Sequence, residues 1–343
     1  MHDLKFASAW FNFTHVVNPS ELRSECLLGI TETFNRNMKR AHTMVTSIPW
    51  FVGRMQLHIR SLMLAKMVIQ KDRIDVFDAN VSEEEWPKIT KFSSHVIKKF
   101  NEDDADLMDR TWQLYSVGSA QFNAAITNAD LGDVDKFAES LLLVMILNSW
   151  SAFEILATDL WIAAVNFGDE SFAANVGGLS RKDSKSFTYA QIHPHIDNLR
   201  NRLGTLLVEA ERVKMDCFRQ IKENYKLAFG KVLEELFELH KGNPANILVL
   251  ESLRNLLMHR GEVVDSDFET QVKEASGCTI PYLLSLKEGD IFLVDGHIAG
   301  TLTYSVLQFG SKLIRIMDEI ITPDDAWNLS SRNPANIAGD WVI

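Results

Sequence analysis

Apolar residues recur at intervals of three and four over most of this chain, which is the spacing that gathers them on one side of an α-helix. The clearest example is 244–260, where the apolar positions are Ile247, Leu250, Leu253 and Leu257. Asn243 followed by proline is a typical helix start, and Gly261 stands where a left-handed residue commonly ends a helix. The sequence therefore predicts a helix that begins after Asn243 and ends at residue 260.

The same periodicity predicts further helices, at 20–47, 53–72, 103–127, 134–167, 197–241 and 301–321. The first is expected to end before Pro49, because proline removes a backbone donor and obstructs a helix interior. The long stretch 197–241 is expected to break near Gly204 or Gly230. Ser82 and Glu85 have the spacing of a capping box at a helix start.

Two segments depart from the helical pattern. Residues 168–187 are rich in glycine and then in serine and lysine, which indicates a loop. Within 278–298, the run Ile291-Phe292-Leu293-Val294 lies between turns of acidic residues and glycine, which predicts a short strand or hairpin. The predicted fold class is all-α, a helical bundle with a short β-hairpin insertion. We expect an additional N-terminal helical region at 1–130, the main helical domain at 131–321 and a loose tail at 322–343.

The composition is that of a globular chain, since 46% of the 343 residues are hydrophobic. Its three cysteines, Cys26, Cys217 and Cys278, are far apart, as is typical of free thiols in a reducing cytoplasm. The first residues lack the pattern of a secretion signal. The most apolar segment, 141–153, is too short to cross a bilayer. We therefore expect a cytoplasmic protein without membrane association.

Arg254, Asn255 and His259 are the residues that indicate a chemistry. A separation of four places Asn255 and His259 on one side of the predicted helix, and the long Arg254 side chain can swing toward them. Glu251, one turn earlier, can brace either Arg254 or Asn255. Cleaving RNA without a metal requires a base for the 2′-hydroxyl, an acid for the leaving 5′-oxygen and a cation beside the phosphate. Histidine, arginine and an orienting amide can supply these functions.

One helix offers only one histidine, so separate acid and base roles need a second copy of the chain or one imidazole acting twice. This favours a homodimer. The residues also fit a structural role, in which Arg254 and Arg260 are solvated, Glu251 pairs with them, and His259 complements the dipole at the helix C-terminus. The spacing alone leaves both interpretations open.

The stretch Arg254-Asn255-x-x-x-His259-Arg260-Gly261, followed by Val263-Val264-Asp265, resembles the signature of the HEPN superfamily of nucleotide-binding helical domains. The resemblance extends less specifically over 137–320 and does not cover 1–130. It implies a HEPN-like bundle that acts as a metal-independent ribonuclease without a cofactor, with its site completed across a two-fold dimer. By the same resemblance, Arg254 would contact the scissile phosphate, Asn255 would orient groups around it, and His259 would transfer protons.

The resemblance also implies supporting residues. The helix that contains Ser151-Ala152-Phe153-Glu154 is similar to the first long helix of such domains, which often carries an acidic residue facing the motif. Glu154 is therefore a supporting candidate, together with Glu251 and Arg260. Members of the superfamily often act as toxins or in defence against phage, and some have lost catalysis and serve as binding or dimerisation modules.

A net charge of −11 argues against a general nucleic-acid binder. RNA is therefore expected to bind weakly, in a cleft lined by Arg254 and Arg260, where the local field opposes the net charge. The acidic surplus also suits an inhibitor or partner protein. Basic residues at 39–40, 54–60 and 181–185 are further candidates for phosphate contact, although charged helix faces and loops are usually solvated surface.

Metal chemistry is a weaker alternative. The acidic turn at 101–106 fits a helix N-terminus as well as a cation site, and His193 and His195 have no matching ligand pair. No metal is expected. The leading prediction is an endoribonuclease that leaves a 2′,3′-cyclic phosphate. The alternatives are a non-catalytic HEPN-like module for RNA or nucleotide binding or for dimerisation, and a helical partner protein whose motif is structural.

Overall fold

The computed structural model describes residues 9, 11, 16–69, 81–102, 116–121, 132–177, 201–209 and 213–323. The chain divides into two compact units. The first comprises 1–10, 42–142 and 294–297, and the second comprises 11–41, 143–293 and 298–343. The expected domains at 1–130 and 131–321 differ from this division, chiefly because 11–41 packs with the second unit.

The described residues form helices and contain no β-strand, which confirms the all-α class. The helices of eight or more residues are α1 (Leu28–Ile69), α2 (Trp86–Glu102), α4 (Gly132–Phe167), α5 (Glu170–Gly177), α8 (Phe218–Phe229), α10 (Gly242–Arg260), α11 (Ser266–Glu274) and α13 (Gly296–Ile321). The shorter ones include η3 (Pro19–Glu21), η4 (Glu25–Leu27), α7 (Leu203–Glu209), α9 (Lys231–Glu234), η6 (Glu235–Phe237) and α12 (Pro281–Ser285).

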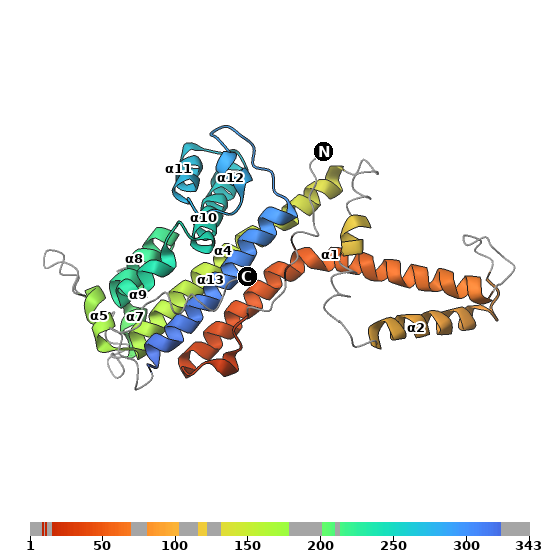
Figure 1. Cartoon of the computed structure of the whole chain (residues 1–343), viewed down its shortest axis with the longest axis horizontal. Helices are drawn as coiled ribbons and strands as arrows, with labels where there is room; N and C mark the ends of the chain where they lie inside the picture. Colours follow the sequence, from red (N-terminus) through yellow and green to blue (C-terminus); the bar gives the residue numbers. More distant parts are fainter. Residues whose placement is uncertain are drawn as a thin grey trace. The chain divides into compact units, whose positions relative to one another are not determined.

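Helices α4 and α13 form the centre of the second unit, where α13 runs beside α4 (Figure 1). The buried hydroxyls of Ser149 on α4 and Thr303 on α13 share a hydrogen bond of 2.8 Å. Gly310 allows the two helices and the start of α1 to approach closely, because a Cβ there would lie 2.4 Å from Cζ of Phe34 and 2.9 Å from Cδ2 of Leu156. Phe153, Phe218, Phe237 and Phe309 pack together in the core, with ring centroids 5.2–6.5 Å apart.

Helix α4 also has the length and composition of a membrane span over Lys136–Phe167, and it is the one such helix among the described residues. Core helices of folded proteins pass the same test, and half of its most apolar window is buried inside the protein. Trp150, Leu156 and Trp161 are at most 1% exposed. These residues make α4 a core helix, as the sequence indicates for 141–153.

Several predicted boundaries are wrong. Helix α1 continues through Pro49 instead of ending before it, so that 20–47 and 53–72 are not separate helices. The absence of a side chain at Gly118 lets helical residues 116–121 approach the backbone of α1 at Pro49 and Gly53, so a second helical segment packs against α1 at the proline. Residues 170–177 are the helix α5 and not a loop. The remainder of the expected loop, 178–187, lies outside the described residues.

The predicted β-hairpin is also wrong. Ile291 forms a single antiparallel bridge with Val263, which lies in the segment after α10, and no strand partner follows within 278–298. The stretch 197–241 breaks at Gly230, which has a φ of +76°, as expected, whereas Gly204 lies inside α7. A further break, which was not predicted, lies at 213–217, where the backbone is not helical. Residues 210–212 lie outside the description, as do most of the predicted helix 103–127 and the tail beyond 323.

Two predicted caps are confirmed. The Ser82 hydroxyl accepts a hydrogen bond from the Glu85 amide, and the Glu85 carboxylate accepts one from the Ser82 amide, both at 3.2 Å. Gly261 ends α10 in the left-handed conformation. The start of α10 differs from expectation, because Lys241 is its N-cap and Asn243 lies in the first turn.

Candidate functional site

The motif lies at the end of α10, where the helix emerges from the core. Residues 244–253 are buried, whereas His259, Arg260 and Gly261 are exposed. Gly261 and Glu262 both have positive φ, at +58° and +76°, and they reverse the direction of the chain. The helix therefore presents its last turn to solvent beside a sharp bend.

The segment after the bend is held by backbone hydrogen bonds to residues 289–292. Val264 N–H donates to the Asp290 carbonyl at 2.9 Å, and Gly289 N–H donates to the Val264 carbonyl at 2.8 Å. Phe292 N–H donates to the Glu262 carbonyl at 2.9 Å. These bonds surround the Val263–Ile291 bridge and fix the path from α10 to α11.

Asp265 links the motif to α11. One carboxylate oxygen accepts from the Phe268 N–H at 2.9 Å and caps the start of that helix, and the other accepts from Nε of Arg260 at 3.3 Å. A carboxylate at this position also favours the helix N-terminus electrostatically. Asp265 consequently compensates the charge of Arg260 and sets where α11 begins.

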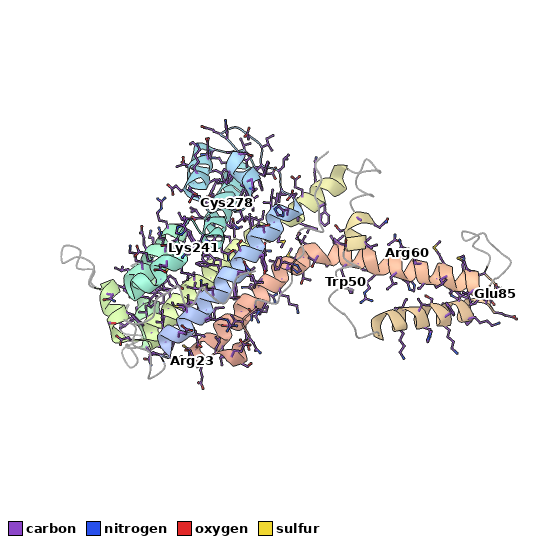
Figure 2. All side chains as sticks on the ribbon, viewed as in Figure 1. Arg23, Trp50, Arg60, Glu85, Lys241 and Cys278 are labelled. Atoms are coloured by element: carbon purple, nitrogen blue, oxygen red, sulfur yellow. The ribbon has the colours of Figure 1, made fainter. Side chains whose placement is uncertain are left out.

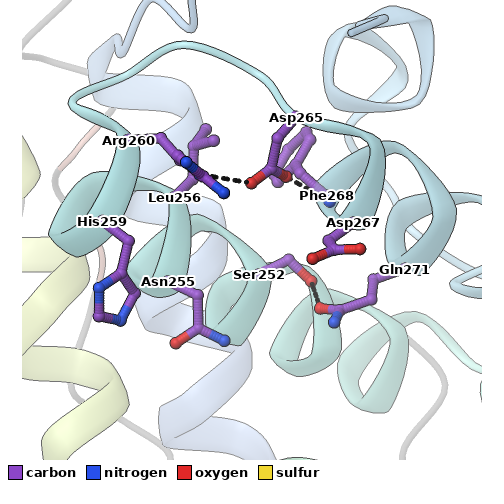
Figure 3. A pocket seen from close by; sticks show the side chains of 9 residues that line it. All are labelled: Ser252, Asn255, Leu256, His259, Arg260, Asp265, Asp267, Phe268 and Gln271. Atoms are coloured by element: carbon purple, nitrogen blue, oxygen red, sulfur yellow. Dashed lines mark hydrogen bonds and ion pairs between the residues drawn. The ribbon is translucent and has the colours of Figure 1, made fainter.

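A pocket of about 380 Å³ lies between α10 and α11. Asn255, His259 and Arg260 line it from α10, and Asp265, Asp267 and Gln271 line it from the opposite side. Figure 3 shows the His259 and Asn255 side chains next to each other at one end, and the Arg260–Asp265 pair above them. At the other end, the Ser252 hydroxyl donates to Oε1 of Gln271 at 2.6 Å. The pocket therefore combines an imidazole, two amides, a paired guanidinium and two carboxylates.

Arg254 is half-buried and does not line this pocket. Its Nη1 donates a hydrogen bond to Oδ1 of Asn255 at 2.9 Å. Because Asn255 lines the pocket, this hydrogen bond holds the Arg254 guanidinium next to a residue of the pocket wall. The structure thus joins Arg254 to Asn255, and Asn255 to His259, as consecutive neighbours.

Glu251 does not brace the motif through a direct hydrogen bond. It is buried, and Oε2 accepts from the Phe218 N–H at 2.9 Å, so that its carboxylate caps the start of α8. Burial raises the pKa of Glu251, while this N–H and then the positive charge of Arg254 act against the increase. Glu251 therefore influences Arg254 through its charge.

Glu154 is half-buried on α4 and has a similar electrostatic relationship. Burial raises its pKa, and the charge of Arg254 opposes that rise. The negative charge of Asp216 adds to the increase for both Glu154 and Glu251. Within the described parts of the chain, Arg254 makes no ion pair shorter than 4.0 Å with any of these carboxylates. Both glutamates belong to its surroundings and not to the pocket.

The sequence did not indicate the α11 side of the pocket. Asp265 was noted only as part of the stretch after the motif, although an aspartate three residues before Phe268 is a recognisable helix cap. A helix that starts after Asp265 places Asp267 and Gln271 on one of its sides, because residues four apart project in nearly the same direction. The signal was present in the sequence, but a nine-residue helix carries only a weak periodicity.

No group of three or more His, Cys, Asp or Glu side chains that could hold a metal ion occurs within the residues that the structure describes. His193 and His195 lie outside this part of the chain, as does 103–106 of the acidic turn. Cys26, Cys217 and Cys278 are free thiols. No family model matches the chain, and neither a curated protein nor a solved structure matches it.

Proposed function

We propose that the chain is a metal-independent endoribonuclease of HEPN type, with His259, Arg254 and Asn255 at its site. The observation that carries the proposal is the contact chain at the end of α10: Arg254 donates to Asn255, and Asn255 lies beside the exposed His259 in a pocket. An accessible imidazole can exchange protons with a substrate, and an arginine fork matches the geometry of a phosphate.

In the proposed reaction, a histidine removes the proton of a ribose 2′-hydroxyl, and the 2′-oxygen attacks the adjacent phosphorus. The bond to the 5′-oxygen breaks, and a protonated histidine returns a proton to that leaving oxygen. The products are a 2′,3′-cyclic phosphate and a free 5′-hydroxyl. Arg254 stabilises the negative charge that develops on the phosphoryl oxygens, while Asn255 orients the guanidinium.

The pocket of one copy offers a single histidine, and Asp265 already compensates Arg260. We therefore propose that two copies join around their motifs, so that one His259 acts as the base and the other as the acid. A second Arg254 would also double the positive charge available to the phosphate. The active species in this proposal is a homodimer, and RNA is its substrate.

The decisive experiment incubates mixed RNA with the wild-type chain and with His259→Ala, both in the presence of EDTA. Wild type is expected to cut and to leave cyclic phosphate ends, while the variant is expected to be inactive because it lacks the proton-transfer group. Met258→Ala is a matched control, since Met258 is 60% exposed on the same turn. Equal cleavage by wild type and His259→Ala would disprove the proposed role of the histidine.

A second candidate function is a non-catalytic HEPN-like module that binds RNA or a nucleotide, or that mediates dimerisation. The carboxylates of Asp265 and Asp267 favour a chain without catalysis, because both line the space near His259 and oppose the close approach of a scissile phosphate to the imidazole. Purified protein that binds RNA but produces no fragments between pH 5 and 8, at low and high salt, would select this alternative.

A further inference from the structure

The two carboxylates of the pocket between α10 and α11 differ in what they have left to bind. Both oxygens of Asp265 are occupied, one by the Phe268 N–H at 2.9 Å and the other by Nε of Arg260 at 3.3 Å. Asp267 lines the same pocket and is exposed, and its carboxylate has no hydrogen bond or ion pair within the described residues. Asp267 is therefore the carboxylate that this pocket offers to a ligand.

The two amides of the pocket have their oxygens occupied. Oδ1 of Asn255 accepts from Arg254 at 2.9 Å. Oε1 of Gln271 lies 2.6 Å from the Ser252 hydroxyl, a separation typical of an O–H···O hydrogen bond and shorter than an N–H···O one. In the described part of the chain, Nδ2 of Asn255 and Nε2 of Gln271 are left without partners. The two amides therefore add N–H donors to the acceptor at Asp267.

The α11 side of the pocket is fixed to α10 before and after α11. Before it, Asp265 joins Arg260 to the start of the helix. After it, the Thr279 N–H donates to Oδ1 of Asn246 at 3.0 Å, and Nδ2 of Asn246 donates to the Thr279 hydroxyl at 2.9 Å. Thr279 follows Cys278, which Figure 2 labels. A ligand consequently meets groups whose positions are already set, which lowers the cost of ordering them.

An unoccupied carboxylate limits which part of an RNA can enter its end of the pocket. It repels a phosphate, so the group that binds beside Asp267 is a hydrogen-bond donor. Guanine presents two adjacent donors, N1–H and the N2 amino group, and the acceptor O6 lies next to them. The two donors match both oxygens of one carboxylate, and O6 matches an amide N–H such as that of Gln271.

The other bases fit this arrangement less well. Adenine and cytosine place an acceptor ring nitrogen beside their amino group, and uracil places a carbonyl oxygen on each side of N3–H. Against a carboxylate, each of these bases makes one hydrogen bond next to a repulsive contact between lone pairs, whereas guanine makes two hydrogen bonds. The difference is expected to favour guanine by about tenfold or more.

We propose that the pocket between α10 and α11 binds a guanine base, with Asp267 as the residue that specifies it. N1–H and the N2 amino group of the base donate to Asp267, and Gln271 donates to O6. The phosphate next to this base lies toward His259, at the opposite end of the pocket from Gln271 (Figure 3). A volume of about 380 Å³ is within the range of ligand sites, about 300–1,000 Å³. The inference deepens the proposed ribonuclease function and rests on it for RNA as the substrate, which is then cut next to guanine.

The test compares the affinity of the full chain for short RNAs that differ in one base. Fluorescent 2′-O-methyl heptanucleotides cannot be cut, because their 2′-oxygens carry no proton and are blocked. Their central base, flanked by uracils, is guanine, 7-deazaguanine, hypoxanthine, adenine or uracil. Hypoxanthine lacks only the N2 amino group of guanine, whereas 7-deazaguanine keeps N1–H, N2 and O6. Fluorescence anisotropy is expected to show equal binding of guanine and 7-deazaguanine, and about tenfold weaker binding of hypoxanthine.

Asp267→Asn is expected to bind the guanine and hypoxanthine RNAs equally, because its amide cannot accept from both donors of guanine. Asp265→Asn is the matched control, since it removes the same charge from the same pocket and leaves Asp267 in place. It is expected to change both affinities by the same factor and to keep their ratio. An aspartate in the first turn also favours a helix N-terminus. That structural role alone would leave the ratio unchanged in Asp267→Asn.

Equal affinity of the wild-type chain for the guanine and hypoxanthine RNAs would overturn the proposal. A preference for guanine that survives in Asp267→Asn, with folding verified by circular dichroism, would overturn it as well. The same sequences as unmodified RNA separate the guanine site from the ribonuclease function. Cleavage that ignores the central base would leave the ribonuclease function in place and overturn the guanine site. Selective binding of guanine without cleavage of any RNA would support the guanine site and overturn the ribonuclease function.

Discussion

Nη1 of Arg254 lies 2.9 Å from Oδ1 of Asn255, so the two adjacent motif residues form one hydrogen-bonded unit on α10. When the amide oxygen of asparagine accepts a hydrogen bond from arginine, it fixes the orientation of the guanidinium. The remaining N–H groups of the guanidinium can then bind a phosphate. Asn255→Ala removes this acceptor without removing any charge.

We therefore predict that Asn255→Ala lowers RNA cleavage by about tenfold, a loss of about 1.4 kcal/mol, whereas His259→Ala abolishes it. Single-turnover cleavage in EDTA measures both rates. Asn255→Asp provides the matched comparison, since a carboxylate still accepts from Arg254 but neutralises its charge. Full activity in Asn255→Ala would show that the hydrogen bond has no role in cleavage.

The second prediction concerns the pocket's charge. Asp265→Asn keeps a side-chain oxygen that can cap α11, because asparagine is as good an N-cap as aspartate. It removes one negative charge and leaves Arg260 without its ion-pair partner. RNA binding at low salt is expected to become about fivefold tighter, or about 1 kcal/mol. Filter binding measures the change.

Asp267→Asn is the control for that measurement. Asp267 lines the same pocket but makes no ion pair within the described residues, so its replacement changes the charge without releasing Arg260. A larger effect for Asp265 than for Asp267 is expected. Unchanged RNA affinity in both variants would place the RNA away from this pocket.

The third prediction follows from the raised pKa of Glu154. Burial is the main cause, and it disfavours the charged carboxylate in the folded chain. A raised folded pKa stabilises the fold below the ordinary value of 4.5, and this contribution is lost as the pH rises through the folded pKa. Glu154→Gln, which stays neutral, is therefore expected to raise the melting temperature at pH 7 and not at pH 4.

Thermal unfolding followed by circular dichroism at both pH values measures this difference. Ser151→Ala is a suitable comparison, because Ser151 is an exposed and uncharged residue on the same helix, so its replacement is expected to have the same effect at both pH values. A Glu154→Gln variant that is less stable than wild type at pH 7 would contradict the argument, because it would mean that the favourable charge of Arg254 outweighs burial.

The fourth prediction tests the core. Gly310→Ala places a Cβ 2.4 Å from Phe34, and the crowded side chains must move, at a cost of about 1–3 kcal/mol. Gly29→Ala is the control, because no atom lies within 4 Å of its Cβ position in α1 and alanine favours a helix. Denaturant unfolding is expected to show a loss for the first variant and no loss for the second.

Local signals along the sequence predicted much of the helical structure. Gly261 and the periodic apolar residues placed the end of α10 correctly, and the Ser82–Glu85 capping box is present as its spacing indicates. Pro49 misled the prediction because the cost of a proline inside a helix is a local property of the sequence. It does not include tertiary packing, such as the contact of the segment around Gly118 with α1 at Pro49. The Ile291 run misled it because its single bridge partner, Val263, is far away in the sequence.

For the candidate site, the sequence identified the α10 residues and their shared side but not the arrangement around them. Glu251 has the spacing of a partner for Arg254, yet its carboxylate bonds to the N–H of Phe218, on a helix that the motif does not specify. Asp265 and Gln271 enter the pocket through the turn at 261–264. Such contacts depend on tertiary structure, which spacing within one helix does not contain.

The bridge between Val263 and Ile291 has a genetic consequence. Residues 287–292 contribute no atom to the pocket, but they fix the turn that separates α10 from α11. Random mutagenesis selected for loss of the proposed ribonuclease activity should consequently recover substitutions at Asp290 and Phe292, some thirty positions downstream of the histidine, in proteins whose motif is intact.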